Sequence, residues 1–536
     1  MVAFLCKAVL AISAWWVVAA GPLVEHVPLM PLPKEHSHGS AAVVIAGPSQ
    51  LKLTVLATGS KAAEEKVIAA FERFVAQTFA GGDDDGDGGS DVALAKVNIV
   101  VDHGDPDLQM GVDESYSLEV PVSGEIRLQA ATVYGAYHGL STLSQLASFD
   151  YDSLSYKISM APWSIQDSPR YPHRELLVDT SRHFLPVVAL EHIIDSMTMA
   201  KVNVLHWHII DIQSFPAASR VHPELAQKGA YGPTERYTWA QMRHIVEFAQ
   251  ARGIRVVPEF DVPAHTDSWH KSHPELFPDE CTQALDPAKE EVYTFYEELL
   301  KDWSDIFTDH VVHLGTDELP TSCWNNSVDI DFMRQQGLSS LNDLFGYFVK
   351  RVVTIAEGLG KRACVWDESV LRTNLTPSAA MVQIWHTNPG LRQLSLSAGH
   401  DVIFSPDGPW YLDGLATTWE QMYEEEPELN GSSGPGRILG GGGEMWGETV
   451  DPSDLESTVW PRMAAIAERL WSPLEETSVG ADAARLRMQA FRCWLLHRGV
   501  RSGLVGGSGR APPPGPGACD QAGKAETETT AKTFVV

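Results

Sequence analysis

The sequence predicts an α/β protein in which a (β/α)8 barrel follows a small α+β domain. Between residues 170 and 500, eight short apolar runs alternate with helix-like segments, which is the order of a parallel barrel. An open doubly wound sheet is the alternative, but it would carry a glycine-rich phosphate turn after the first strand, and that turn is missing. With 44% hydrophobic and 21% charged residues among 536, the composition is that of a globular chain.

Residues 1–20 predict a secretory signal peptide. One positive charge, Lys7, precedes the apolar run Ala8–Ala20, which ends in small residues. The run is shorter than a membrane span of about 20 residues, although an uncleaved anchor is the alternative. We therefore expect a secretory-pathway protein with no membrane span after cleavage, located in a lysosome, a vacuole or the extracellular space. Three Asn-X-Ser/Thr sequons agree with this, at Asn325, Asn374 and Asn430.

Residues 49–165 predict the small α+β domain. Short β-like runs are interspersed with two helix-like segments, Ala62–Thr78 and Ala131–Ser148. An acidic, glycine-rich stretch at 81–90 interrupts them. It lacks the closing Glu of an EF-hand loop, so a solvated loop is favoured over a calcium site. The predicted strands are Lys52–Ala57, Val97–Asp102, Ser117–Val122 and Glu125–Ala130.

Residues 170–500 carry the predicted catalytic barrel, in which short strands and longer helices alternate. Its eight predicted strands are Glu175–Thr180, Val202–Ile210, Ile254–Phe260, Val311–Leu314, Ala363–Trp366, Met381–Trp385, Asp401–Ser405 and Ile438–Met445. Its clearest helices are Val187–Lys201, Trp239–Arg252, Lys289–Phe307, Leu341–Glu357 and Asp454–Leu470.

The tail at 503–536 is rich in Gly, Pro, Ala and Thr, which predicts disorder apart from whatever Cys519 tethers. Five cysteines remain after the signal peptide, and an oxidising compartment permits disulfides. We expect Cys281 to pair with Cys323, and Cys493 with Cys519. Cys364 stands in a β-like run and predicts a small buried thiol.

The charge balance argues against nucleic acid as a partner. Lys and Arg number 40 and Asp and Glu number 70, so the net charge is −30. A chain this acidic repels phosphate backbones. The 16 Trp residues suit flat, amphipathic ligands such as sugar rings, although most Trp serve as core; we expect Trp207, Trp460 and Trp471 to do so.

Polar and aromatic residues stand where the predicted strands end. The carboxyl ends of barrel strands form one face, and active sites are built there. Carboxylates beside aromatic faces in one mouth suit a sugar. In chain order, the candidates are Arg182, Asp211, His265, Asp317 with Glu318, Trp366, Trp385, Tyr411 with Asp413, and Trp446 with Glu448.

Cleavage of a glycosidic bond usually needs two separated carboxyl groups. Asp317 and Glu318 are neighbours in the chain, so they cannot easily flank a scissile bond from opposite sides. Either a partner carboxylate lies on another strand, or the substrate supplies its own nucleophile.

Six sequence blocks carry a family resemblance: RELLVDTSRHFLP at 174–186, NVLHWHIIDIQSFP at 203–216, PEFDVPAHTDSW at 258–269, HLGTDE at 313–318, PWYLD at 409–413, and the segment 446–472 that begins WGETVD. Together they resemble family 20 glycoside hydrolases, the β-N-acetylhexosaminidases, especially those of the lysosomal and other eukaryotic type. The resemblance spans about residues 50–500. It implies a small α+β domain before a barrel, exo-hydrolysis of terminal β-linked N-acetylglucosamine or N-acetylgalactosamine, no cofactor or metal, and a homodimer.

The resemblance also implies roles for individual residues. Glu318 would be the general acid/base. Asp317 would orient the 2-acetamido group, whose carbonyl oxygen attacks the anomeric carbon to give an oxazolinium intermediate and net retention. The anion of Asp317 would raise the pKa of Glu318, and His265 with Asp211 would tune it. Tyr411 would bind the acetamide, Trp366, Trp385 and Trp446 would wall its pocket, and sugar hydroxyls would go to Arg182, Asp211, Asp413 and Glu448.

Some positions depart from the family pattern. Thr316 stands where Gly is usual, and because β-branched residues avoid positive φ, we expect a negative φ there. Ile212 replaces a common Asp, and Glu175 and Ala264 replace common glycines. Asp413-Gly414 stands in place of the Asn-Arg pair of forms that accept anionic sugars, so we expect neutral substrates.

Two other hypotheses remain open. A metal-dependent hydrolase could use His206, His208, His265 and Asp317, but the chain supplies no bridging Lys. A catalytically impaired glycan-binding protein on the same barrel is the second, and Thr316 is the feature that favours it. Chelator sensitivity would support the first, and tight sugar binding without turnover the second.

Overall fold

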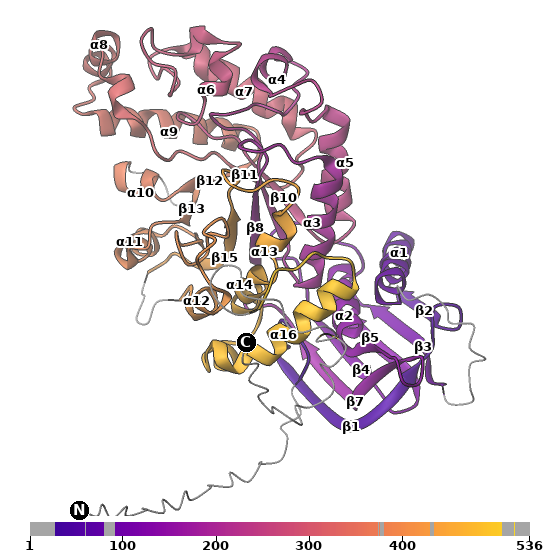
Figure 1. The fold of residues 1–536 in the computed structure, drawn as a ribbon. Coiled ribbons are helices and arrows are strands. Elements are labelled where there is room, and N and C mark those ends of the chain that lie inside the picture. Colours follow the sequence, from indigo (N-terminus) through magenta and orange to yellow (C-terminus); the bar gives the residue numbers. More distant parts are fainter. Residues whose placement is uncertain are drawn as a thin grey trace, which may run out of the picture.

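The computed structural model describes residues 27–58, 60–79, 92–373, 375, 380–428, 434–505 and 519 (Figure 1). The predicted signal peptide, the acidic loop at 81–90, the sequons at Asn374 and Asn430, and all of the predicted tail except residues 503–505 and 519 lie outside them. Within the described part of the chain, no helix is both long and apolar enough to cross a membrane.

Eight parallel strands close into a barrel, which confirms the predicted fold class. Consecutive strands pair around the ring, and the last strand pairs with the first. Most strand residues are buried because helices cover the outer face. The strands are β8 (His173–Asp179), β9 (Val204–His208), β10 (Arg255–Glu259), β11 (Val311–His313), β12 (Arg362–Trp366), β13 (Ala380–Ile384), β14 (Val402–Phe404) and β15 (Ile438–Met445).

The helices around the barrel follow the predicted pattern with one correction. The single helix expected over Asp454–Leu470 is two helices, because Pro461 has no backbone N–H and disfavours a helical conformation at the residue before it. The helices are α3 (Val187–Met199), α4 (Glu224–Gly229), α5 (Trp239–Gln250), α6 (Asp267–His270), α7 (Glu290–Ser304), α8 (Ser327–Gln336), α9 (Leu341–Gly358), α10 (Glu368–Arg372), α11 (Pro389–Ala398), α12 (Trp419–Glu424), α13 (Leu455–Val459), α14 (Arg462–Trp471), α15 (Leu474–Thr477) and α16 (Ala481–His497).

A seven-stranded mixed sheet with two helices precedes the barrel. Its strand order is β1-β3-β5-β4-β7-β6, with β2 on β3 and a further antiparallel pairing of β1 with β7. β1 lies ahead of residue 49, where we place the start of the domain. The elements are β1 (Glu35–Ile45), β2 (Lys52–Ala57), α1 (Lys61–Thr78), β3 (Val92–Val101), β4 (Tyr116–Val120), β5 (Gly124–Ala130), α2 (Val133–Leu146), β6 (Ala147–Asp150) and β7 (Ser155–Asp167).

Buried ion pairs join the sheet domain to the barrel. Arg174, at the start of β8, donates to Glu114 at 2.5 Å, and Lys201 donates to Asp167 at 2.7 Å. The indole of Trp471 also donates to Asp167, at 2.9 Å. These contacts occupy the amino-terminal side of the barrel, which leaves the carboxyl ends of its strands free to form a mouth.

The disulfides and core positions follow the prediction. Cys281 is bonded to Cys323 and Cys493 to Cys519, while Cys364 is a free, buried thiol. Trp207, Trp460 and Trp471 are fully buried. Cys364 belongs to an apolar layer inside the barrel near the amino ends of the strands, and a polar layer lies above it toward the mouth.

Candidate active site

An arginine, an aspartate and a histidine form the charged centre of the mouth. Arg182, just after β8, donates to Asp179 at 3.1 Å and lies 2.8 Å from Asp211. His265, in the loop after β10, donates from Nδ1 to Asp211 Oδ1 at 3.1 Å. The cations around Asp211 hold its pKa well below the usual range, although burial opposes them. Asp211 is therefore a fixed anion in contact with Arg182, His265 and His208.

The two predicted catalytic carboxylates follow β11 and face His265. Its Nε2 lies 3.5 Å from Glu318 Oε2 and 3.8 Å from Asp317 Oδ2. The Glu318 side chain is 60% exposed, whereas that of Asp317 is only 14% exposed. Asp317 Oδ1 is buried and has no hydrogen-bond partner among the described residues. One carboxylate therefore faces solvent, and the other keeps a free acceptor inside the mouth.

Aromatic rings line the mouth beside this pair. Trp446 lies next to Trp366 and Tyr411, with ring centroids 6.1 and 6.3 Å away. The guanidinium of Arg182 sits over the Trp446 ring at 5.0 Å. Trp366 is almost fully buried, and its indole donates to Glu259 at 2.8 Å. The rings thus come from the end of β12 and from the segments that follow β14 and β15.

The remaining predicted residues lie at the same barrel face with fewer contacts. Glu448 is exposed and lies 3.8 Å from Arg182. Asp413 is partly buried, and its Oδ1 has no hydrogen-bond partner in the described structure. Burial and the charge of Glu448 raise the pKa of Asp413 to about 6. Trp385 follows β13. Its buried indole N–H has no hydrogen-bond partner among the residues described, and its ring lies 3.9 Å from that of His386.

The pKa shifts of the catalytic pair correct one expectation. Burial raises the pKa of Asp317 to about 6, while the charge of His265 opposes that shift. The pKa of Glu318 is lowered rather than raised, chiefly because the imidazole of His265 lies 3.5 Å from its carboxylate. The effect of His265 on the pKa of Glu318 thus outweighs that of Asp317, its neighbour in the sequence.

Two residues outside the predicted hexosaminidase site, His208 and Glu259, lie directly behind it. His208 donates from Nε2 to Asp211 at 2.7 Å and from Nδ1 to Glu259 at 2.5 Å. These carboxylates raise the pKa of His208 to about 10 despite its burial. Both ring nitrogens of His208 therefore face carboxylates, which hold the ring in place behind Asp211. The alternation in the segment His206-Trp207-His208 was the available signal, since it places both imidazoles on one strand face.

Behind these two residues the polar layer continues to Glu175, which replaces a glycine of the family pattern. Glu259 lies 3.1 Å from His206, and His206 donates to Glu175 at 3.0 Å. Glu175 also accepts from His173 at 2.7 Å and from Gln383 at 2.7 Å. The carboxylate at this unusual position is therefore completely buried and fully paired.

The expected negative φ at Thr316 is wrong. Its φ is +77°, and Gly315 and Glu318 have φ values of +66° and +46°. Tertiary contacts hold the turn, because the Thr316 N–H donates to Asp261 at 3.0 Å and its hydroxyl bonds that of Ser369 at 2.6 Å. A Cβ on Gly315 would lie 1.7 Å from an oxygen of Asp261, so only glycine fits there.

Substitutions at Thr316 test this account of the turn. We expect Thr316→Val to lower the free energy of unfolding by about 1–3 kcal/mol, because the buried Ser369 hydroxyl loses its partner and the strain remains. Thr316→Gly should cost less, because glycine adopts this φ without strain. Urea unfolding measures both. A loss for the glycine variant as large as that for the valine variant would contradict the assigned strain.

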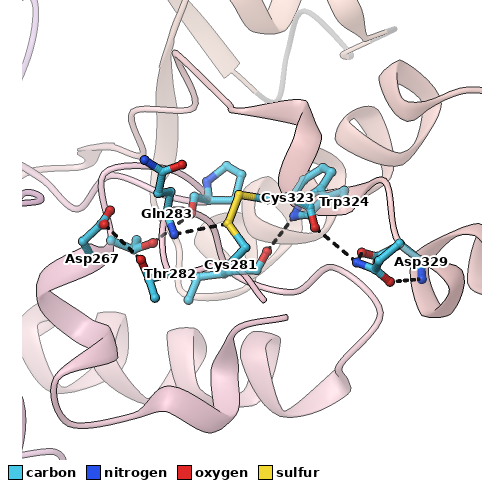
Figure 2. Close-up of a disulfide and its surroundings, with 11 residues drawn as sticks. Asp267, Cys281, Thr282, Gln283, Cys323, Trp324 and Asp329 are labelled. Carbon is cyan, nitrogen blue, oxygen red and sulfur yellow. Dashed lines mark hydrogen bonds between the residues drawn. A yellow bond between two sulfur atoms is a disulfide. The ribbon is translucent and has the colours of Figure 1, made fainter. Parts of the chain in front are cut away.

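The Cys281–Cys323 disulfide ties together the two loops that carry the catalytic candidates (Figure 2). Cys281 belongs to the loop after β10, which also carries His265, and Cys323 follows Glu318 by five residues. Near the disulfide, Thr282 donates to Asp267 at 3.3 Å, and the indole of Trp324 donates to the Leu285 carbonyl at 2.9 Å. The crosslink thus limits how far the His265 loop and the Glu318 loop can separate.

Comparison with known proteins identifies the family. Residues 171–474 match the model of the glycosyl hydrolase family 20 catalytic domain, and residues 29–146 match a domain described as beta-acetyl hexosaminidase like. This chain belongs to glycosyl hydrolase family 20. It is 40% identical over 514 residues to beta-hexosaminidase 1 of Arabidopsis thaliana, covering 92% of this chain and 94% of that protein.

Other family 20 members agree with this assignment. The chain is 38% identical over 406 residues to the beta-hexosaminidase beta subunit of Mus musculus, covering 72% of this chain and 74% of the mouse protein. The X-ray structure of the Flavobacterium johnsoniae chitobiase superposes with a TM-score of 0.77 at 27% identity, covering 88% of this chain and 73% of that chain. The family 20 chain described here is thus a glycoside hydrolase, and the resemblance found in its motifs is confirmed.

Proposed function

We propose that this family 20 enzyme removes terminal β-linked N-acetylglucosamine or N-acetylgalactosamine from oligosaccharides or glycoconjugates, with Glu318 as acid/base and Asp317 as partner of the 2-acetamido group. The observation that carries the proposal is the different environment of the two adjacent carboxylates, Asp317 and Glu318. Asp317 Oδ1 is a buried, unused acceptor, which suits the N–H of a substrate amide. Glu318 faces solvent and can reach a glycosidic oxygen or a water.

The proposed first step breaks the glycosidic bond without a protein nucleophile. The acetamide carbonyl oxygen attacks the anomeric carbon, and the bond to the leaving oxygen breaks as Glu318 gives that oxygen its proton. Asp317 accepts the amide N–H and opposes the positive charge of the oxazolinium ring. The buried position of Asp317 makes this charge stabilisation stronger than it would be in water.

The second step returns the enzyme to its starting state. Glu318, now ionised, takes a proton from water while the water oxygen attacks the anomeric carbon. The bond to the acetamide oxygen breaks, and the amide reforms. Two displacements at the same carbon give net retention. The step needs no metal or cofactor, since each proton moves through Glu318.

The rest of the mouth positions the sugar in this proposal. Arg182 is held by Asp179 and Asp211, so its planar fork is fixed before a ligand arrives. Glu448 and Asp413 offer further carboxylates to hydroxyl groups, and Trp446, Trp385 and Tyr411 surround the acetamide. Trp366 packs beside Trp446. The acidic rim repels anionic sugars, so neutral substrates are favoured.

The cellular setting and assembly complete the proposal. The two disulfides require an oxidising compartment, which agrees with the secretory-pathway location of a eukaryotic-type family member. We place the enzyme in a lysosome, a vacuole or the extracellular space, and we propose a homodimer. Asn325 is exposed and available to glycosylation.

Two matched substrates test the proposal near pH 5. The enzyme should hydrolyse an aryl N-acetyl-β-glucosaminide and leave the aryl β-glucoside uncleaved, because the glucoside lacks the attacking acetamide. Equal hydrolysis of both would show that a protein carboxylate is the nucleophile. Cleavage of neither by folded enzyme would favour the glycan-binding hypothesis.

The pH dependence of kcat/KM follows from the unlike pKa values of the pair. Turnover needs one proton shared by Asp317 and Glu318. The last proton leaves as pH rises through about 6, the pKa that burial gives Asp317. We therefore expect a basic limb near pH 6 and a tenfold loss per unit above it. A pH–rate profile of the aryl substrate measures this limb, and a plateau that extends past pH 8 would contradict the assignment.

A further inference from the structure

A second cluster of histidines and glutamates lies outside the active site. It consists of His222, just before α4, Glu224 on α4, and His273, between α6 and the 3-10 turn Pro274–Leu276. One ligand atom from each residue lies within 4.8 Å of the others, and all three side chains are partly exposed. Figure 1 shows α4, α6 and α7 grouped at one end of the barrel.

Glu224 is the shared centre of this cluster. Its Oε1 lies 2.9 Å from His273 Nε2 and 3.9 Å from His222 Nδ1. His273 Nε2 is buried and makes no hydrogen bond with any described residue, so the angle of this close approach is not that of a hydrogen bond. In a tetrahedral site with ligands about 2.0–2.1 Å from the ion, ligand atoms stand about 3.3–3.4 Å apart. The distances of 2.9 and 3.9 Å from Glu224 to the two histidines lie on either side of this ligand spacing.

A carboxylate stands behind each imidazole. His273 Nδ1 lies 2.9 Å from Glu275, and His222 Nε2 lies 3.2 Å from Glu298 on α7. A metal-bound histidine characteristically points its other ring nitrogen at a carboxylate, which fixes its tautomer and orientation. His273 meets that condition with a hydrogen bond to Glu275, and His222 Nε2 points at Glu298 without hydrogen-bond geometry.

The rings are also held in place before any ion arrives. The ring of Phe295, on α7, lies 3.8 Å from that of His222 and 4.6 Å from that of His273. Three carboxylates around two imidazoles give the cluster a net negative charge, which Lys228 offsets only in part.

We propose that His222, Glu224 and His273 form a binding site for a divalent transition-metal ion of the Zn²⁺ class. The donor set of two imidazoles and one carboxylate suits Zn²⁺ and leaves a fourth position for water. Glu275 and Glu298 orient the two imidazoles. The ion would link α4 to the segment after α6, behind the loop that carries His265, and it takes no part in the glycosidase chemistry.

Direct metal uptake tests the site. Full-length enzyme is stripped with chelator, dialysed at pH 7 and titrated with ZnCl₂ by calorimetry, and Co²⁺ absorption reports the coordination geometry. We expect one equivalent of metal and intense visible bands of a four-coordinate Co²⁺ ion. His222→Gln and His273→Gln should each weaken binding at least tenfold, and Glu275→Gln and Glu298→Gln should weaken it about 10–100-fold.

A matched control separates this site from simple ion pairing. His244 donates to Glu191 at 2.7 Å and belongs to no candidate metal-binding group among the described residues, so His244→Gln should leave metal uptake unchanged. Glu224→Gln keeps side-chain volume and serves if a histidine variant misfolds. No saturable uptake by the parent enzyme at 100 µM metal would overturn the proposal, as would uptake that the His222 and His273 variants leave unaltered. Either result would mean that these residues form ion pairs and bind no metal.

Discussion

Glu318→Gln is expected to lower kcat for an aryl N-acetyl-β-glucosaminide by about 10²–10⁴-fold, because general acid/base catalysis contributes an effect of that size. The amide is nearly isosteric with the carboxylate, and half of the side chain is already in solvent, so the fold should survive. His265 would keep its bond to Asp211 at 3.1 Å. Steady-state kinetics of the parent and the variant measure the change, and KM should change little.

The leaving group provides an internal check on Glu318. Proton donation matters most for a poor leaving group, so the loss should be larger for an alkyl glycoside than for an activated aryl glycoside. His183→Gln is a suitable control, because His183 is exposed and contacts the Gly447 carbonyl at the rim, where it touches neither carboxylate. A uniform loss across leaving groups would mean that Glu318 only shapes the mouth.

The barrel could be predicted because its strands are short, apolar and separated by amphipathic helices. That pattern is local, and the bounds of β2 and β15 match the prediction residue for residue. β1 was missed for the opposite reason. It pairs with β7 across more than 100 residues of chain, and about half of its positions face solvent, so its apolar pattern is weak.

The site shows the same division between local and tertiary information. Motifs placed Arg182, Asp211, His265 and the catalytic pair in one mouth, where the structure brings them into contact. The φ of Thr316 could not be foreseen, since residue preference alone forbids it and only Asp261 and Ser369 hold it. The pKa of Glu318 depends on a histidine 53 residues away, and no spacing rule in the sequence predicts that contact.

Asp317→Asn is expected to lower kcat by about 10²–10³-fold, comparable to the loss of one preorganised group that stabilises transition-state charge. The asparagine can still hydrogen-bond an acetamide but cannot oppose the positive oxazolinium ring with a full charge. KM should therefore change by much less than kcat. Because the variant also lacks the group that carries the upper pKa, its basic limb should move from about pH 6 toward the lower pKa of Glu318.

A second aspartate in the mouth, Asp413, tests whether the effect is specific to Asp317 or follows from the loss of any carboxylate there. Asp413→Asn removes a carboxylate whose pKa is also about 6, but in this structure it contacts neither His265 nor Glu318. We expect Asp413→Asn to raise KM and to leave the basic limb in place. If Asp317→Asn instead raised only KM, the acetamide would not depend on that charge, and a protein nucleophile elsewhere in the mouth would have to be sought. The paired variants thus decide whether the buried, unshared oxygen of Asp317 is the acceptor that substrate-assisted catalysis requires.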